Sequence, residues 1–127
     1  MNCLALDLGK RRTGVAVAQG HLITALPTLF TDRPGFESAL EQLIAEFKVT
    51  EIVLGWPSSE DGSQNQQTAW VQSWLDRPLF QGLTVHLTNE YLTSYEAKRQ
   101  IKEGLAPGYH DIDQLSAVLI LEQFLNE

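Results

Sequence analysis

The amino-acid sequence predicts an α/β fold in which helices cover both faces of a five-stranded mixed sheet. Three strand-like segments, at residues 3–8, 13–18 and 21–26, follow one another with only short links. Two more, at residues 51–54 and 83–88, alternate with segments of helical periodicity. Short links favour antiparallel pairing, whereas strands separated by helices favour parallel pairing, so the two patterns together predict a mixed sheet.

The first three strands are expected to form an antiparallel ribbon. Residues 3–8 are a continuous apolar run that ends in Asp-Leu-Gly, which is the pattern of a buried strand whose last residues leave the core. The second and third strands are joined by Gln19-Gly20. A two-residue link that contains glycine predicts a hairpin.

Helical signals occur in four places. Residues 36–47 carry apolar side chains every three or four positions, with Pro34 close to the first turn. Ser63 can cap a second helix, and Thr93 with Glu96 matches a capping box that predicts a third. A fourth helix, beginning near residue 111, is apolar enough to pack tightly on the sheet. The second helix carries Trp70 and Trp74, which we interpret as core residues rather than as a platform for stacking bases.

The composition fits one domain that spans residues 1–127. The chain is 43% hydrophobic, which is enough for one continuous core. The sequence shows neither a targeting segment nor an apolar run of membrane-spanning length, so we expect a cytoplasmic protein that does not contact a membrane. The single cysteine, Cys3, lies in an apolar run, which predicts a buried thiol rather than a disulfide.

The charge distribution restricts how nucleic acid can bind. The net charge of −7 opposes attraction of a polyanion to the whole surface. Three cations are nevertheless adjacent directly after the first strand, namely Lys10, Arg11 and Arg12. We interpret them as a local nucleic-acid-binding group, and a solvated turn is the alternative.

Three carboxylates are the candidates for chemistry. Asp7 is the one charged residue in an apolar strand, where a carboxylate needs a partner, a proton or a metal. The alternative is that Asp7 caps the turn at Gly9. Glu90 follows the fifth strand and shares the parity of its polar residues. Asp113 lies on the helix face that should meet the sheet, whereas Asp111 is better placed to cap that helix.

Ligands of open α/β sheets gather at the carboxyl ends of the strands, so Asp7, Glu90 and Asp113 are expected to meet there. Carboxylates without a Cys or His cluster form a hard-oxygen site that suits one or two Mg²⁺ or Mn²⁺ ions. Such ions activate water and neutralise the charge that develops on a phosphodiester. The sequence therefore predicts metal-assisted hydrolysis of phosphodiester bonds, with these three residues as catalytic groups and metal ligands.

Three motifs resemble one known family over nearly the whole chain. They are LALDLGKRRTGVAVA near the N-terminus, IVLGWPSSEDGS in the middle and DQLSAVLILEQFL near the C-terminus. The chain resembles the YqgF or RuvX-like Holliday junction resolvases, also described as pre-16S rRNA nucleases. The resemblance implies an RNase H-like fold that acts in rRNA processing or on Holliday-junction-like DNA. It implies a nucleic-acid partner, with RNA favoured over DNA and the choice between monomer and homodimer open.

Carried over by position, the three acidic residues of the family fall on Asp7, Glu90 and Asp113. The resemblance also implies a set of turn and loop residues near the substrate groove. These are Gly9, Gly14, Gly55, Pro57, Asp61 and Gly62.

Besides Trp56, which stands where a Leu is usual, the chain departs from the family pattern in two places. Relatives usually have Asp-Glu-Arg where this chain has Asn89-Glu90-Tyr91, so a guanidinium expected to hold phosphate is missing. The segment GLAPGYHDI before Asp113 lacks the lysines and arginines that are common there. Both departures favour the main alternative, which is an RNase H-like nucleic-acid-binding protein with weakened or lost turnover.

A minor alternative is a nucleotide phosphotransferase of the actin, Hsp70 and sugar-kinase superfamily. Those enzymes share the ribbon topology and an Asp-Leu-Gly turn like that at residues 7–9. They close two such domains around ATP, and a chain of 127 residues lacks the second wall.

Overall fold

A computed structural model describes residues 2–56, 66–89 and 112–126. The strands are β1 (Asn2–Leu8), β2 (Arg12–Gln19), β3 (Leu22–Phe30), β4 (Glu51–Trp56) and β5 (Thr84–Asn89). The helices are α1 (Phe36–Glu46), α2 (Gln66–Leu75), the 3₁₀ helix η1 (Pro78–Phe80) and α4 (Ile112–Leu125). The helix predicted from Thr93 lies outside the described residues.

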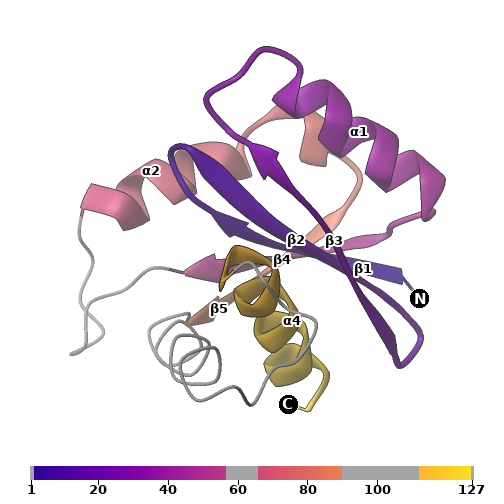
Figure 1. Cartoon of the computed structure of the whole chain (residues 1–127). Helices are drawn as coiled ribbons and strands as arrows, with labels where there is room; N and C mark the ends of the chain where they lie inside the picture. The colour runs from indigo at the N-terminus through magenta and orange to yellow at the C-terminus, as the bar shows by residue number, and fades with distance from the viewer. Residues whose placement is uncertain (1, 57–65, 90–111, 127) are drawn as a thin grey trace.

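The strands form one mixed sheet in the order β3-β2-β1-β4-β5, as Figure 1 shows. The β1–β2 and β2–β3 pairs are antiparallel, whereas β1–β4 and β4–β5 are parallel. The predicted five-stranded mixed sheet is therefore confirmed. Because β1, β4 and β5 run in the same direction, their carboxyl ends lie along one edge of the sheet.

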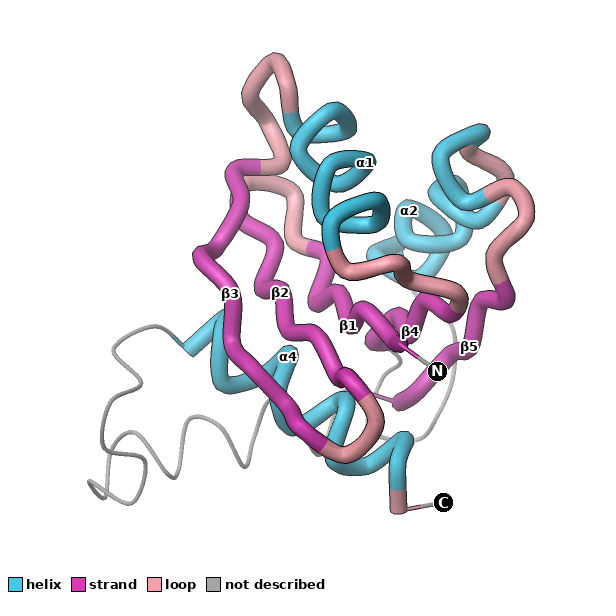
Figure 2. The backbone as a smooth tube through the Cα atoms, turned by 90° about the vertical axis from the view of Figure 1, so that its right-hand side faces the viewer, coloured by secondary structure: helices cyan, strands magenta, loops and turns pink. Residues whose placement is uncertain are grey.

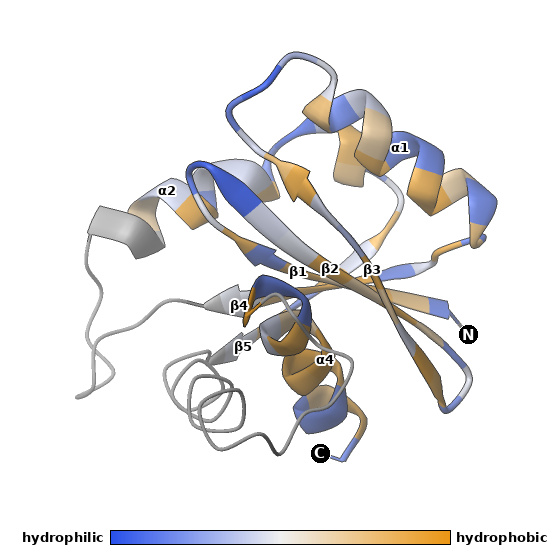
Figure 3. Cartoon of the chain, viewed as in Figure 1, coloured by the Kyte–Doolittle hydropathy of each residue, from blue (hydrophilic) through white to orange (hydrophobic). Residues whose placement is uncertain are grey.

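Helices cover both faces of this sheet, as predicted: α1 and α2 lie on one face and α4 on the other (Figure 2). Strand alternation divides β1 between them. Leu4, Leu6 and Leu8 pack in the cluster beneath α1 and α2, whereas Cys3 and Ala5 pack beneath α4. Figure 3 shows the apolar residues concentrated along the central strands and on α4.

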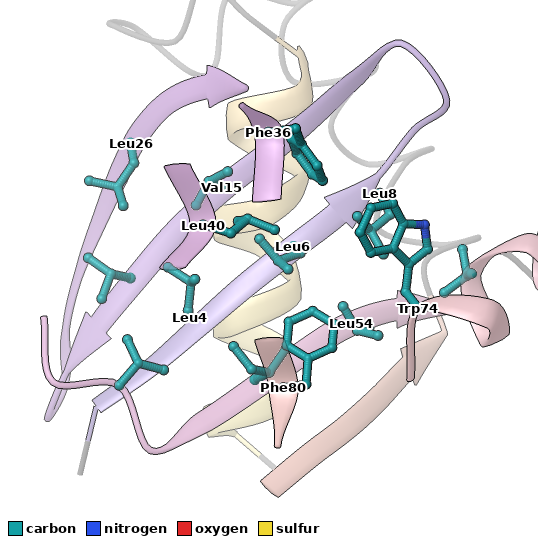
Figure 4. Close-up of a cluster of buried hydrophobic side chains, with 14 residues drawn as sticks. Leu4, Leu6, Leu8, Val15, Leu26, Phe36, Leu40, Leu54, Trp74 and Phe80 are labelled. Atoms are coloured by element: carbon teal, nitrogen blue, oxygen red, sulfur yellow. The ribbon is translucent and has the colours of Figure 1, made fainter. Parts of the chain in front are cut away.

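The larger of the two clusters holds the bulky side chains drawn in Figure 4. Leu6 and Leu40 are fully buried, and full burial of such a side chain contributes about 1.5–3 kcal/mol. Trp74 is only 5% exposed and makes edge-to-face ring contacts with Phe36 and Trp70. The tryptophans of α2 are therefore core residues, as the sequence indicated.

The strand ends lie within two residues of the predictions except at the end of β3, and two of the differences have a clear physical reason. The β2–β3 turn consists of Gly20-His21 rather than Gln19-Gly20, because Gln19 is still paired with Leu22. Gly20 adopts a positive φ of 63°, a conformation that glycine allows at low cost. β3 also continues through Pro27 to Phe30, which is possible because β3 is an edge strand with a bulge there.

The helix predictions agree with the described segments. α1 begins after Gly35 and buries Phe36 and Leu40 as its apolar spacing predicted. α2 is described from Gln66, so the predicted cap at Ser63 lies outside the described residues. No helix in the described segments is long and apolar enough to cross a membrane.

The thiol of Cys3 is buried and free, as predicted. Burial raises the pKa of this thiol to about 11, and a hydrogen bond donated to Glu51 Oε2 at 3.4 Å acts in the same direction. The thiolate is the reactive form, so Cys3 is held in its inert state.

We expect Cys3 of the native protein to react with a small aromatic disulfide reagent at pH 8 about 100-fold more slowly than Cys3 of the urea-unfolded chain. A pKa about two units higher lowers the thiolate fraction by about that factor. The measurement is the rate at which the absorbance of the released aromatic thiolate rises, with and without urea. Equal rates would show that β1 does not bury the thiol.

Candidate functional site

Asp7 lies near the carboxyl end of β1, at the edge where the three parallel strands end. It follows Cys3 and Ala5 in the strand alternation, so its side chain points to the face covered by α4. It is partly buried rather than exposed. A carboxylate at the end of an otherwise buried strand is thus held between the sheet and the helix.

Gly14 connects Asp7 with Asp113. In the antiparallel ladder between β1 and β2, Asp7 is paired with Gly14. A Cβ atom built on Gly14 would overlap the backbone carbonyl of Asp113. Only glycine permits so close an approach. Asp7 and Asp113, far apart in sequence, are therefore both immediate neighbours of Gly14.

The first turn of α4 is attached to the sheet by two side-chain contacts as well. Gln114 Nε2 donates a hydrogen bond to the carbonyl oxygen of Leu26 in β3 at 2.8 Å. Arg12 Nε lies 3.2 Å from Asp113 Oδ2, with the Asp113 side chain 20% exposed. The predicted inward face of α4 is confirmed, because Ala117 and Ile120 are buried against the sheet.

The cationic turn lies beside this helix terminus. Gly9 allows the turn to close, since a Cβ there would overlap the carbonyl of Arg12. The amide of Thr31 donates to the carbonyl of Arg11 at 2.8 Å, and the hydroxyls of Thr13 and Thr31 lie 2.6 Å apart. These bonds fix the backbone of the turn, while its three cationic side chains, predicted to bind nucleic acid, remain exposed.

Thr88 is a residue that the sequence did not single out. It is paired with Gly55 in the β4–β5 ladder and is 3% exposed. Its hydroxyl is buried, and it has no hydrogen-bond partner among the residues that the structure describes. A buried hydroxyl left unsatisfied costs about 1–3 kcal/mol, and such groups often serve a ligand or water. The only sequence signal was its place on the polar side of an alternating strand.

Thr88 pairs with Gly55, and Asp7 and Gly55 each directly follow the last β1–β4 pair, Leu6 with Leu54, so strand alternation points Thr88 and Asp7 to the same face of the sheet. Two strand spacings separate them, about 10 Å. Gly55 has no side chain to fill the position between them. The carboxylate and the hydroxyl therefore border the same strip of the sheet.

The donors at this edge are oxygen atoms, from Asp7, Asp113 and Thr88. Cys3 and His86 instead contact Glu51 near the opposite end of the parallel strands, with His86 Nε2 3.0 Å from Glu51 Oε1. An oxygen-only set fits Mg²⁺ or Mn²⁺ better than zinc. Within residues 2–56, 66–89 and 112–126, no three His, Cys, Asp or Glu side chains form a complete metal cluster.

Several predicted site residues lie outside the described residues. Glu90, the third carboxylate, immediately follows Asn89, the last residue of β5. The structure therefore describes two of the three predicted metal ligands, and the complete trio stays a prediction. The others outside the described residues are Pro57, Asp61, Gly62, Asp111 and the Tyr91 departure.

A comparison with protein families decides the relationship. All residues from 1 to 127 match the family model RuvX, described as Holliday junction resolvase. The chain belongs to the RuvX family. The resemblance carried by its three sequence motifs is thereby confirmed.

Curated relatives of this RuvX-family chain carry the name "Putative pre-16S rRNA nuclease". The protein from Synechococcus elongatus is 38% identical over 132 residues, covering 98% of the chain and 88% of the relative. The protein from Koribacter versatilis is 37% identical, with 96% and 84% covered. The family is thus one of nucleases that act on phosphodiester bonds.

Solved structures support the RNase H-like fold. RuvC of T. thermophilus, in a complex with a Holliday junction substrate, matches with a TM-score of 0.60 and 14% identity. The match covers 99% of this chain and 95% of RuvC. At this identity the similarity concerns the fold alone.

We expect Gly14→Ala to lower the free energy of unfolding by about 1–3 kcal/mol, because the new methyl group overlaps the Asp113 carbonyl and displaces the first turn of α4. Urea denaturation measures the change. The matched control is Gly20→Ala, where nothing lies within 4 Å and only the strain of a positive φ is added. The control should leave the amide signals of α4 unshifted. Unshifted α4 signals in Gly14→Ala would contradict the close contact.

We expect Thr88→Val to raise the free energy of unfolding by about 1 kcal/mol, because valine keeps the shape and removes an unsatisfied buried hydroxyl. Thr84→Val on the same strand is the control, since Thr84 is exposed. Denaturation in EDTA excludes any contribution from metal. A loss of stability on Thr88→Val would mean that the hydroxyl is hydrogen-bonded in the folded chain.

Proposed function

We propose that this RuvX-family chain is a metal-dependent endonuclease of structured nucleic acid, with precursor 16S rRNA as its first candidate substrate and junction DNA as its second. The observation that carries the proposal is the contact at Gly14, which makes Asp7 and Asp113 neighbours at the carboxyl edge of the sheet. The names of the relatives favour RNA, and the description of the family model favours junction DNA. Processing of rRNA would place the activity in the cytoplasm.

Asp7, Asp113 and Glu90 are the proposed ligands of one or two Mg²⁺ or Mn²⁺ ions. Two of them are the carboxylates around Gly14, and the third follows β5, the strand that carries Thr88. A divalent ion bound there would supply an activated water and neutralise negative charge on the phosphodiester. The oxygen donors described at this edge suit such an ion.

Arg12 has a double role in this proposal. Its Nε contacts the Asp113 carboxylate, and this is only one of the five N–H donors of a guanidinium. The terminal nitrogens can hold a phosphate oxygen while Nε orients the carboxylate. The buried Thr88 hydroxyl can hydrogen-bond a water or a phosphate oxygen at the same face.

The same ion pair favours a second candidate function, binding of nucleic acid without hydrolysis. An arginine that remains on Asp113 competes with a cation for that carboxylate. Tyr91 in place of the usual arginine acts in the same direction, because it removes a phosphate contact. The two functions differ in whether the bound strand is cut.

We expect Asp7→Asn to reduce cleavage of structured RNA or four-way-junction DNA at least about 100-fold. Substituting a residue that only hydrogen-bonds a metal ligand lowers metal affinity or activity about 10- to 100-fold. Asp7 is proposed as a direct ligand, so its substitution should have at least the larger of these effects. The measurement is the single-turnover rate in Mg²⁺ and in Mn²⁺, and EDTA should abolish it. Asp76→Asn, which removes an exposed carboxylate after α2, is the matched control and should cleave as the parent does.

Equal cleavage by the parent chain and Asp7→Asn would identify the activity as a contaminant and exclude the nuclease. Tight binding of the substrate by the parent chain without cleavage in either metal would support the binding protein instead.

A further inference from the structure

Beside the cationic turn the surface is hollowed, with a volume of about 480 Å³. The hollow is lined by Arg11, Arg12, Phe30, Asp32 and Arg33. Residues 31–34 link β3 to α1, and no local sequence pattern singles out Phe30 or Arg33. The β2–β3 register pairs Phe30 with Arg12, and Arg33 lies over the ring of Phe30, so both residues are beside the cationic turn.

The hollow carries an excess of positive charge. Three of the nine Lys and Arg residues of the chain line it, against one carboxylate, in a protein of net charge −7. A local positive site on an acidic protein selects an anion that it can surround, rather than attracting polyanions generally. Guanidinium groups suit phosphate, which they bind through paired N–H donors.

Phe30 gives the hollow a second kind of recognition. Its side chain is 42% exposed although it is a large apolar ring. The guanidinium of Arg33 lies over this ring, with Cζ 4.0 Å from the ring centroid. A flat aromatic ring and a flat guanidinium are both surfaces on which nucleic-acid bases stack. Phosphate and base recognition are therefore available within one hollow.

The position of the hollow relates it to the carboxylates. Arg12 lines the hollow and also contacts Asp113 at 3.2 Å. The backbone there is fixed, because Thr31 donates to Arg11 and the Thr13 and Thr31 hydroxyls are bonded. A strand whose phosphate reaches Arg12 is thus adjacent to the proposed metal ligands.

We infer that Arg11, Arg12, Arg33 and Phe30 form a subsite for one unpaired nucleotide of the substrate strand, next to the bond that is cut. The guanidinium groups hold its phosphate, and the base stacks on the Phe30 and Arg33 surface. This inference rests on the proposed function for its placement beside the cleaved bond. It makes the substrate a strand with an unpaired nucleotide beside the cleavage point rather than a continuous duplex, in which bases are not free to stack on protein.

The test measures binding in the Asp7→Asn background, so that no strand is cut. Fluorescence anisotropy gives Kd for three labelled probes of equal length, namely single-stranded RNA, the same RNA as a duplex, and an abasic strand. We expect Phe30→Ala to weaken binding of the single strand about 5- to 150-fold, the range for losing one base stack, and to leave the abasic strand unchanged. Phe30→Leu should show the same loss, because leucine keeps apolar bulk on this edge strand without the flat ring.

Arg33→Ala should weaken binding of both single strands and lower the slope of log Kd against log salt by about 0.7, the value for one phosphate contact on a single strand. The matched control is Arg77→Ala. Arg77 also lies over an aromatic ring, 4.2 Å from the Trp74 centroid, but outside the hollow, and it pairs with Glu37. The Arg77→Ala substitution removes one positive charge, as Arg33→Ala does, and should leave Kd for all three probes unchanged.

Three results would overturn the subsite: no effect of Phe30→Ala, equal losses for Arg33→Ala and Arg77→Ala, or a duplex bound as tightly as the single strand. An effect of Arg33→Ala without one of Phe30→Ala falls under the first of these results, and it would mean that the hollow is a phosphate contact without base recognition. The subsite can be wrong while the nuclease proposal is right, because the nuclease proposal is tested by cleavage with Asp7 intact and the subsite by binding in the Asp7→Asn chain.

Discussion

The close approach of α4 to Gly14 is the contact on which the arrangement of the site depends. The missing side chain of Gly14 is what lets the carbonyl of Asp113 rest against the central ribbon. Because Asp7 is the residue opposite Gly14 in the ladder, a single small residue determines how near the two carboxylates lie. The contact of Gln114 with Leu26 then holds the helix terminus in place. Steric fit at a glycine, rather than attraction between side chains, makes the two acidic residues neighbours of the same ladder position.

The Asp113 carboxylate forms an ion pair with Arg12. The first turn of α4 also favours a negative charge, because the helix dipole is positive at its N-terminus. An exposed ion pair of this kind contributes at most about 1 kcal/mol, and the Arg12 side chain is 54% exposed. It is therefore weak enough to be rearranged by a divalent cation or a phosphate. The same residue links the carboxylates to the arginine-lined hollow, so cation, phosphate and base would be recognised over one continuous surface.

The sequence predicted the fold and the faces on which Asp7 and Asp113 lie, because both depend on periodicity. Alternation along β1 puts Asp7 on the face of the sheet that α4 covers. The helical phase of α4 puts Asp113 on the side of the helix that meets the sheet. The hairpin turn was misplaced by one residue, since Gln19-Gly20 and Gly20-His21 are equally good turn signals until the pairing of Gln19 is known. The third strand runs four residues past its predicted end at Leu26, because an edge strand tolerates Pro27. Phe30, Arg33 and Thr88 were missed because their roles arise from cross-strand register and burial, which a single sequence does not encode in any local pattern.

A metal at the carboxyl edge is the central claim, and a crystal soaked in Mn²⁺ tests it most directly. Anomalous scattering locates manganese without any assumption about activity or substrate. We expect a peak within bonding distance of carboxylate oxygens of both Asp7 and Asp113, with Glu90 completing the set. A well-ordered crystal in which manganese binds elsewhere, while Arg12 keeps its contact with Asp113, would contradict it.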